Sequence, residues 1–159
     1  MTSYNTQGAE WRRSQSARYL NGIAASGRRI AALNAELDAR RELVRGISYD
    51  RLAVSTSPTA DAIPDAVARM QETSAAIAAE IEGYSRAVAE CHDALDEMGG
   101  WEADLLRLRY LAGKTLVEIG RMDAWSHDRK YMSVLHTTAL VRFADFIPAP
   151  MREPRPRAV

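Results

Sequence analysis

The sequence predicts an all-α fold, in which a long antiparallel coiled-coil helical hairpin precedes a C-terminal three-helix helix-turn-helix module. Three observations lead to this prediction. Alanine, the residue that most favours helices, supplies 27 of the 159 residues. Apolar and small residues recur at alternating intervals of three and four over two long stretches. The nine glycines and six prolines lie largely outside those stretches, as expected for helices.

The first periodic stretch, residues 9–47, predicts one long helix. Its members alternate strictly by three and four, which is the spacing of a coiled-coil seam. The predicted seam is Ser16, Tyr19, Ile23, Ser26, Ile30, Leu33, Leu37, Arg40, Val44 and Ile47.

The second stretch, residues 64–98, predicts another long helix with the same spacing and no charged residue in its seam. The predicted seam is Val67, Met70, Ser74, Ile77, Ile81, Tyr84, Val88, Cys91, Leu95 and Met98. Residues 48–62 contain the Ser, Thr, Asp and Pro typical of a loop. Pro64 then fits the first turn of the second helix.

Charge supports pairing of these two helices into a hairpin over residues 9–98. Residues 9–47 carry eight arginines against four acids, whereas residues 64–98 carry two arginines against eight acids. Opposite charges beside two seams favour their contact. A two-helix hairpin buries one stripe per helix, so apolar residues outside the seams, such as Leu20, Leu43 and Ile63, lead us to expect a homo-oligomer.

Residues 101–146 predict three shorter helices after the Gly99-Gly100 pair, which permits a sharp change of direction. The first helix runs from Trp101 and stops at Gly113. The second opens with a capping box, in which Thr115 and Glu118 satisfy each other's main-chain N–H groups. The third starts at Ser126 or Asp128, and its apolar face is Met132, Leu135, Ala139, Phe143 and Phe146.

These segments resemble a known family. The run LLRLRYLAGKTLVEIGRM, followed by LHTTAL, is similar to the fourth region of sigma-70-type factors. The version it resembles occurs in small phage transcriptional regulators of the ArpU and RinA type. In that family a coiled-coil half precedes the helix-turn-helix, so the resemblance covers roughly residues 19–143. It implies a DNA-binding phage or prophage regulator that acts on double-stranded DNA, with RNA polymerase as a further partner, in the cytoplasm of a bacterial host cell.

The resemblance also implies site residues, because the last helix of a helix-turn-helix enters the major groove with its N-terminal end. The expected DNA-binding residues are Ser126, His127, Arg129, Lys130 and Ser133. The residues expected to support the helix-turn-helix are Thr115, Glu118, Ile119 and Leu135.

Two features leave an alternative function open. The connection before the last helix is about two residues longer than in the family, and Ala124 replaces the usual turn glycine. Residues 101–146 carry seven basic groups against six acids, which is less basic than most DNA-binding domains. The alternative is a non-enzymatic coiled-coil interaction or assembly protein that has lost DNA contact.

The sequence favours neither an enzyme nor a metal protein, and it predicts no cofactor and no small-molecule substrate. His127 and His136 are nine residues apart, so on one helix they lie on opposite faces. The single cysteine, Cys91, belongs to a predicted seam. No apolar run is long enough for a membrane span or a signal peptide, so we expect no membrane partner. Residues 147–159, rich in Pro and Arg, predict a disordered tail.

Overall fold

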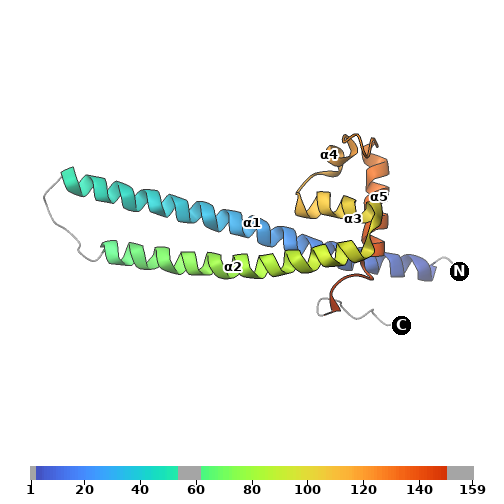
Figure 1. Ribbon diagram of the computed structural model, residues 1–159, viewed down its shortest axis with the longest axis horizontal. Helices are drawn as coiled ribbons and strands as arrows, with labels where there is room; N and C mark the ends of the chain where they lie inside the picture. Colours follow the sequence, from blue (N-terminus) through green and yellow to red (C-terminus); the bar gives the residue numbers. More distant parts are fainter. Residues whose placement is uncertain (1–2, 54–61, 150–159) are drawn as a thin grey trace. The chain divides into compact units, whose positions relative to one another are not determined.

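The computed structural model describes residues 3–53 and 62–149, with side chains described at 7–46 and 64–149. Every regular element in these ranges is helical, which confirms the all-α class (Figure 1). The elements in chain order are α1 (Ser3–Ala53), α2 (Ala62–Met98), α3 (Gly100–Leu106), the π-helix η1 (Arg107–Leu111), α4 (Leu116–Gly120) and α5 (Arg129–Phe143).

The two long helices are longer than the sequence pattern predicts. Residues 48–53, which we assigned to a loop, continue α1 to Ala53. No glycine or proline occurs in Ser48–Ala53, so nothing in that segment breaks the helix. At the start of α2, Pro64 lies in the first turn, where a missing main-chain N–H costs no hydrogen bond.

The described chain divides into two compact units. Unit 1 contains the residues up to Ala25 together with those from Arg86 onwards, and unit 2 contains Ser26–Ser85. Unit 1 therefore combines the start of α1 and the end of α2 with all the shorter helices.

In unit 2, α1 and α2 make contacts that run in opposite chain directions. Arg29 Nε lies 3.0 Å from a carboxylate oxygen of Glu80, and Arg40 Nη1 donates a 3.1 Å hydrogen bond to Thr73 Oγ1. As the residue number rises along α1, the number of its partner on α2 falls. These two segments are therefore antiparallel. The predicted α1 seam agrees with this packing, since Leu37 is buried and its described neighbours in the unit 2 seam are half-buried.

The predicted seam of α2 is wrong in every second position within unit 2. Val67 and Ile81 are 39% and 42% exposed, and Ser74 is also exposed. The residues that precede them by one position are half-buried instead. These half-buried residues are Ala66, Thr73 and Glu80. Polar partners on α1 explain why this row faces α1. Arg40 binds Thr73 and Arg29 binds Glu80, so these two polar side chains have partners at positions where periodicity alone favours apolar residues.

Every helical segment of unit 1 contributes buried apolar side chains. Its largest fully buried side chains include Leu20, Leu95, Leu105, Leu106, Ile119, Met132, Phe143 and Ile147. Leu20, which we expected to be free for another copy, is therefore a core residue. Ile147 is buried as well, so the predicted tail does not begin at residue 147, and residues 150–159 lie outside the described residues. The prediction for Ile63 also falls on a side chain outside the described set.

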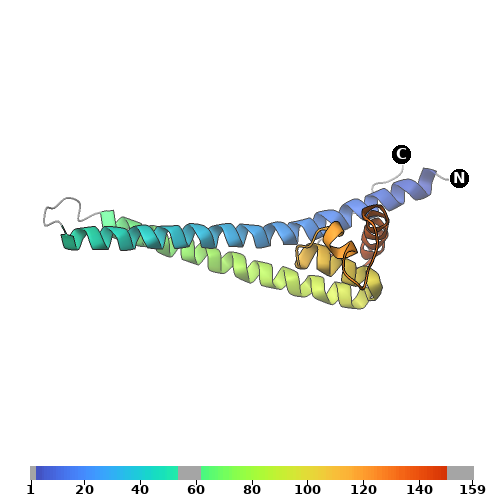
Figure 2. The ribbon, with the colours of Figure 1, turned by 90° about the horizontal axis from the view of Figure 1, so that it is seen from above.

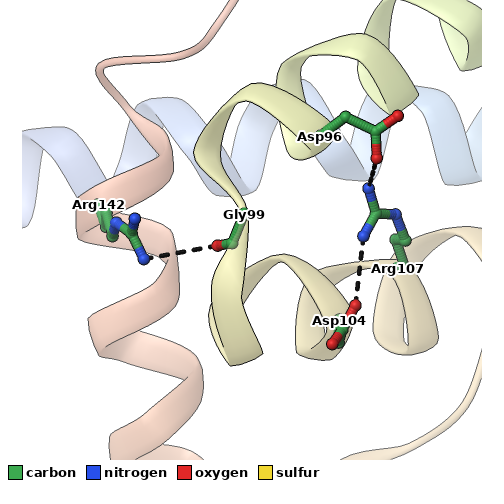
Figure 3. A network of polar contacts seen from close by, with 5 residues as sticks. All are labelled: Asp96, Gly99, Asp104, Arg107 and Arg142. Atoms are coloured by element: carbon green, nitrogen blue, oxygen red, sulfur yellow. Dashed lines mark hydrogen bonds and ion pairs between the residues drawn. The ribbon is translucent and has the colours of Figure 1, made fainter.

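The chain turns sharply between α2 and α3 at Gly99 and Gly100. Their φ angles are 60° and 79°, a backbone region that side chains with a Cβ rarely adopt. Beside this corner, Arg107 pairs with Asp96 of α2 and with Asp104 of α3 (Figure 3). The predicted change of direction is thus present, and an arginine bridge joins the helices on its two sides.

Candidate nucleic-acid interface

The helix α4 begins with the predicted capping box. The main-chain N–H of Glu118 donates to Thr115 Oγ1 at 3.2 Å, and the main-chain N–H of Thr115 donates to Glu118 Oε2 at 2.6 Å. The hydrogen bond from the Thr115 main chain, followed by that from its hydroxyl, lowers the pKa of Glu118. Both donors at the start of α4 are therefore satisfied by an ionised carboxylate and a hydroxyl.

Eight residues, 121–128, connect α4 to α5, whereas a typical helix-turn-helix turn has three or four. The connection is closed on itself by main-chain hydrogen bonds. His127 N donates to Gly120 O at 3.0 Å, and Met122 O accepts from Trp125 N and Ser126 N, each at 2.9 Å. Ser126 has a φ of 44°, in the left-handed region. The longer turn predicted from the sequence is thus an ordered connection.

Asp128 caps the N-terminus of α5. This position agrees with one of the two predicted starts of the helix, Ser126 and Asp128. Its carboxylate accepts a 2.8 Å hydrogen bond from the main-chain N–H of Tyr131. Met132, Ala139 and Phe143 are buried along one face of α5, and Leu135 is half-buried. α5 packs on both α3 and α4, and Figure 1 and Figure 2 show α5 beside α3 from two directions.

The connection before α5 and the N-terminal end of α5 carry the residues that the sequence suggests for DNA contact. All five predicted DNA-binding side chains are exposed: Ser126, His127, Arg129, Lys130 and Ser133. The ring of His127 lies edge-on to that of Tyr131, with 4.5 Å between the ring centroids. Of the predicted supporting residues, Ile119 is buried and Leu135 half-buried, while Thr115 and Glu118 form the capping box.

Four exposed cations of residues 114–130 make no ion pair with the described residues: Lys114, Arg121, Arg129 and Lys130. Two of them flank α4, and the other two open α5. Lys114 and Arg121 both contribute to lowering the pKa of Glu118. An anionic ligand can bind such cations directly, because no internal ion pair has to break first.

Sequence reasoning missed a contact between η1 and α5. The hydroxyl of Tyr110 lies 3.0 Å from Nε2 of His136, and the two rings stack with centroids 5.7 Å apart. Burial is the main cause that raises the pKa of Tyr110 and lowers that of His136. Arg109 also lies over the Tyr110 ring, 5.8 Å from its centroid. Helical periodicity gives no signal for a π-helix, so the position of Tyr110 could not be inferred from spacing.

Cys91 is buried in unit 1, and burial raises the pKa of its thiol to about 11. Such a thiol is protonated near neutral pH and is a poor nucleophile. Within residues 3–53 and 62–149, no three His, Cys, Asp or Glu side chains gather as metal ligands would.

No protein-family profile, no curated protein and no solved structure matches this chain. In the part of the chain that the structure describes, none of the helices has the length and apolarity needed to cross a bilayer.

Proposed function

We propose that this protein binds double-stranded DNA through the N-terminal end of α5 and regulates phage or prophage transcription. The observation that supports the proposal is the exposure of Arg129 and Lys130, without an ion pair among the described residues, on the first turn of a capped helix that packs on α4. In a helix-turn-helix, this end of the second helix reaches base edges and phosphates.

The resemblance to ArpU and RinA regulators supplies the biological setting of the proposal. It suggests a sigma-70 region 4-like module that acts in a bacterial host cell, with RNA polymerase as a further partner. Within the proposal, unit 2 is an antiparallel coiled-coil hairpin, which agrees with the opposite chain direction of its contacts. The proposal therefore assigns DNA binding to unit 1 and gives the hairpin of unit 2 no DNA contact.

A titration of labelled duplex DNA tests the proposal directly. We expect the double variant Arg129→Glu, Lys130→Glu to bind duplex DNA at least tenfold more weakly than the unchanged chain. Each phosphate contact contributes about −0.9 to the slope of log affinity against log salt, so the slope should become shallower by about two units. Measurements at two salt concentrations give both quantities.

The matched control reverses two exposed arginines of α1, Arg13 and Arg28, which gives the same change in net charge. We expect this control to keep most of the DNA affinity. Equal losses in the two double variants would show that net charge alone governs binding. Unchanged affinity in the α5 variant would refute α5 as the reader of DNA.

A specific observation also supports the alternative, a coiled-coil assembly protein without DNA contact. Tyr131 and Val134, three residues apart on α5, are 49% and 57% exposed. Large apolar side chains on an exposed helix face are typical of protein contacts. If duplex DNA does not bind at low salt, where phosphate contacts are strongest, this second function becomes the better account.

A further inference from the structure

Two tryptophans of unit 1 join α3 to the connection before α5. Trp101 lies in the first turn of α3, and Trp125 lies in the connection, residues 121–128. Their rings meet edge to face, with the centroids 6.3 Å apart. Aromatic pairs prefer this separation and this angle. Trp101 is 40% exposed and Trp125 is half-buried, so neither ring belongs to the buried core. The connection therefore has a ring contact with α3 in addition to its main-chain hydrogen bonds.

Trp125 directly precedes the two predicted DNA-binding residues of the connection, Ser126 and His127. Ser126 has a φ of 44°, a backbone region that a residue with a side chain keeps only where its surroundings hold it there. After Ser126, the main-chain N–H of His127 donates a 3.0 Å hydrogen bond to the carbonyl of Gly120. Ser126 is thus held between the ring contact of Trp125 on one side and a main-chain hydrogen bond on the other.

We propose that Trp101 is a positioning residue for the DNA-binding end of α5, and that it acts through Trp125 on Ser126 and His127. This inference rests on the proposed function, because it takes this end of the molecule as the part that binds duplex DNA. Without the ring of Trp101, the connection loses its contact with α3 and adopts more conformations. The affinity for DNA then falls by the fraction of molecules that no longer have the binding conformation.

Hydrogen exchange followed by NMR tests the first step without DNA. The main-chain N–H of His127 is the reporter, because it donates to Gly120 within the connection. We expect Trp101→Ala to speed its exchange by about fivefold, a factor in the range that an aromatic pair contributes. Trp101→Phe keeps a ring and should exchange at nearly the rate of the unchanged chain. The matched control is Trp11→Ala, which removes a half-buried tryptophan of α1 and should leave this rate unchanged.

Titration of labelled duplex DNA tests the second step, at low salt and at a temperature where circular dichroism shows every variant to be folded. We expect Trp101→Ala to raise the dissociation constant by about fivefold, and Trp101→Phe to restore most of the affinity. If Trp101→Ala unfolds, Trp101→Leu takes its place, because leucine keeps apolar volume without an aromatic ring.

A double-mutant cycle tests the route through Trp125. If Trp101 acts through Trp125, the double variant Trp101→Ala, Trp125→Ala should bind DNA no more weakly than Trp125→Ala alone. Additive losses would overturn this route. Unchanged exchange at His127, or unchanged DNA affinity in Trp101→Ala, would overturn the positioning role and leave the proposed function standing. Absence of duplex binding by the unchanged chain would refute the proposed function, and the positioning role with it.

Discussion

Nη2 of Arg142, near the end of α5, donates a 2.7 Å hydrogen bond to the main-chain carbonyl of Met98, the last residue of α2. The same guanidinium lies 3.5 Å from the carbonyl oxygen of Gly99 (Figure 3). It also lies 2.8 Å from the carboxylate of Glu102. Carbonyls at a helix C-terminus have no partner within the helix, and a cation also compensates the negative end of the helix dipole. Arg142 therefore holds α5 to the corner between α2 and α3.

We expect Arg142→Ala to lower the free energy of unfolding by about 1–2 kcal/mol. The reason is that the main-chain carbonyls of Met98 and Gly99 lose a charged hydrogen-bond donor. Urea denaturation followed by circular dichroism measures the change. Arg13→Ala, an exposed arginine of the same unit, is the control and should change the midpoint little. Indistinguishable midpoints for the two variants would contradict the role of Arg142.

Gly120 has no room for a side chain. A Cβ at this position would collide with the main-chain carbonyl oxygen of His127 and would lie 3.0 Å from Cγ of Met132. We therefore expect Gly120→Ala to destabilise the protein by about 1–3 kcal/mol, the usual cost of overpacking. Thermal unfolding measures this loss.

Gly83→Ala is the matched control for that substitution. Gly83 lies within α2, and nothing stands within 4 Å of a Cβ built there. Replacing glycine by alanine inside a helix should stabilise the protein by about 0.5–1 kcal/mol. The two alanine variants should shift the melting temperature in opposite directions, and a shift in the same direction would be incompatible with the closed connection before α5.

The contact of His136 with Tyr110 predicts a pH dependence of stability. Burial, and then the charge of Arg109, hold the pKa of His136 below its ordinary value of 6.5. Below about pH 6.5 the unfolded chain therefore takes up a proton that the folded chain resists. The stability contributed by neutral His136 is complete above pH 6.5 and is lost as the pH falls toward the folded pKa.

Unfolding free energies measured between pH 5.5 and 7.5 check this prediction. The slope contributed by one histidine cannot exceed about 1.4 kcal/mol per pH unit. We expect His136→Gln to remove that contribution, whereas His92→Gln, at an exposed position of α2, should retain it. Parallel pH curves for His136→Gln and the unchanged chain would rule the effect out.

The hydroxyl of Thr115 is the acceptor at the N-terminus of α4, so Thr115→Ala should cost about 1 kcal/mol. Thr115→Ser keeps the hydroxyl and should retain most of the stability. Chemical denaturation of the two variants separates the stability lost with the hydrogen bond from the stability lost with the methyl group. Equal destabilisation by alanine and serine would assign the effect to packing instead.

The sequence predicted those features that depend on local chemistry. Thr115 and Glu118 have the spacing of a capping box, so the start of α4 could be predicted. For α5 the sequence left two possible starts, Ser126 and Asp128, and the structure has Asp128 as the N-cap. Gly99 and Gly100 likewise indicated a change of direction, and both have positive φ angles.

Features that depend on contacts between distant residues could not be predicted in this way. Val67 and Ile81 look like seam residues by spacing, yet the arginine contacts of Thr73 and Glu80 place another row of α2 against α1. The contact of Tyr110 with His136 joins residues 26 positions apart and depends on a π-helix that no periodicity indicates.

The continuity of α5 has a geometric consequence. Its 15 residues form a rod about 22 Å long at ~1.5 Å per residue, with Asp128 at one end and Arg142 in its last turn. In that last turn the guanidinium of Arg142 binds the carbonyl of Met98. Because an α-helix has a set rise per residue, the start of α5 lies about 20 Å along the helix axis from the side chain that binds the end of α2.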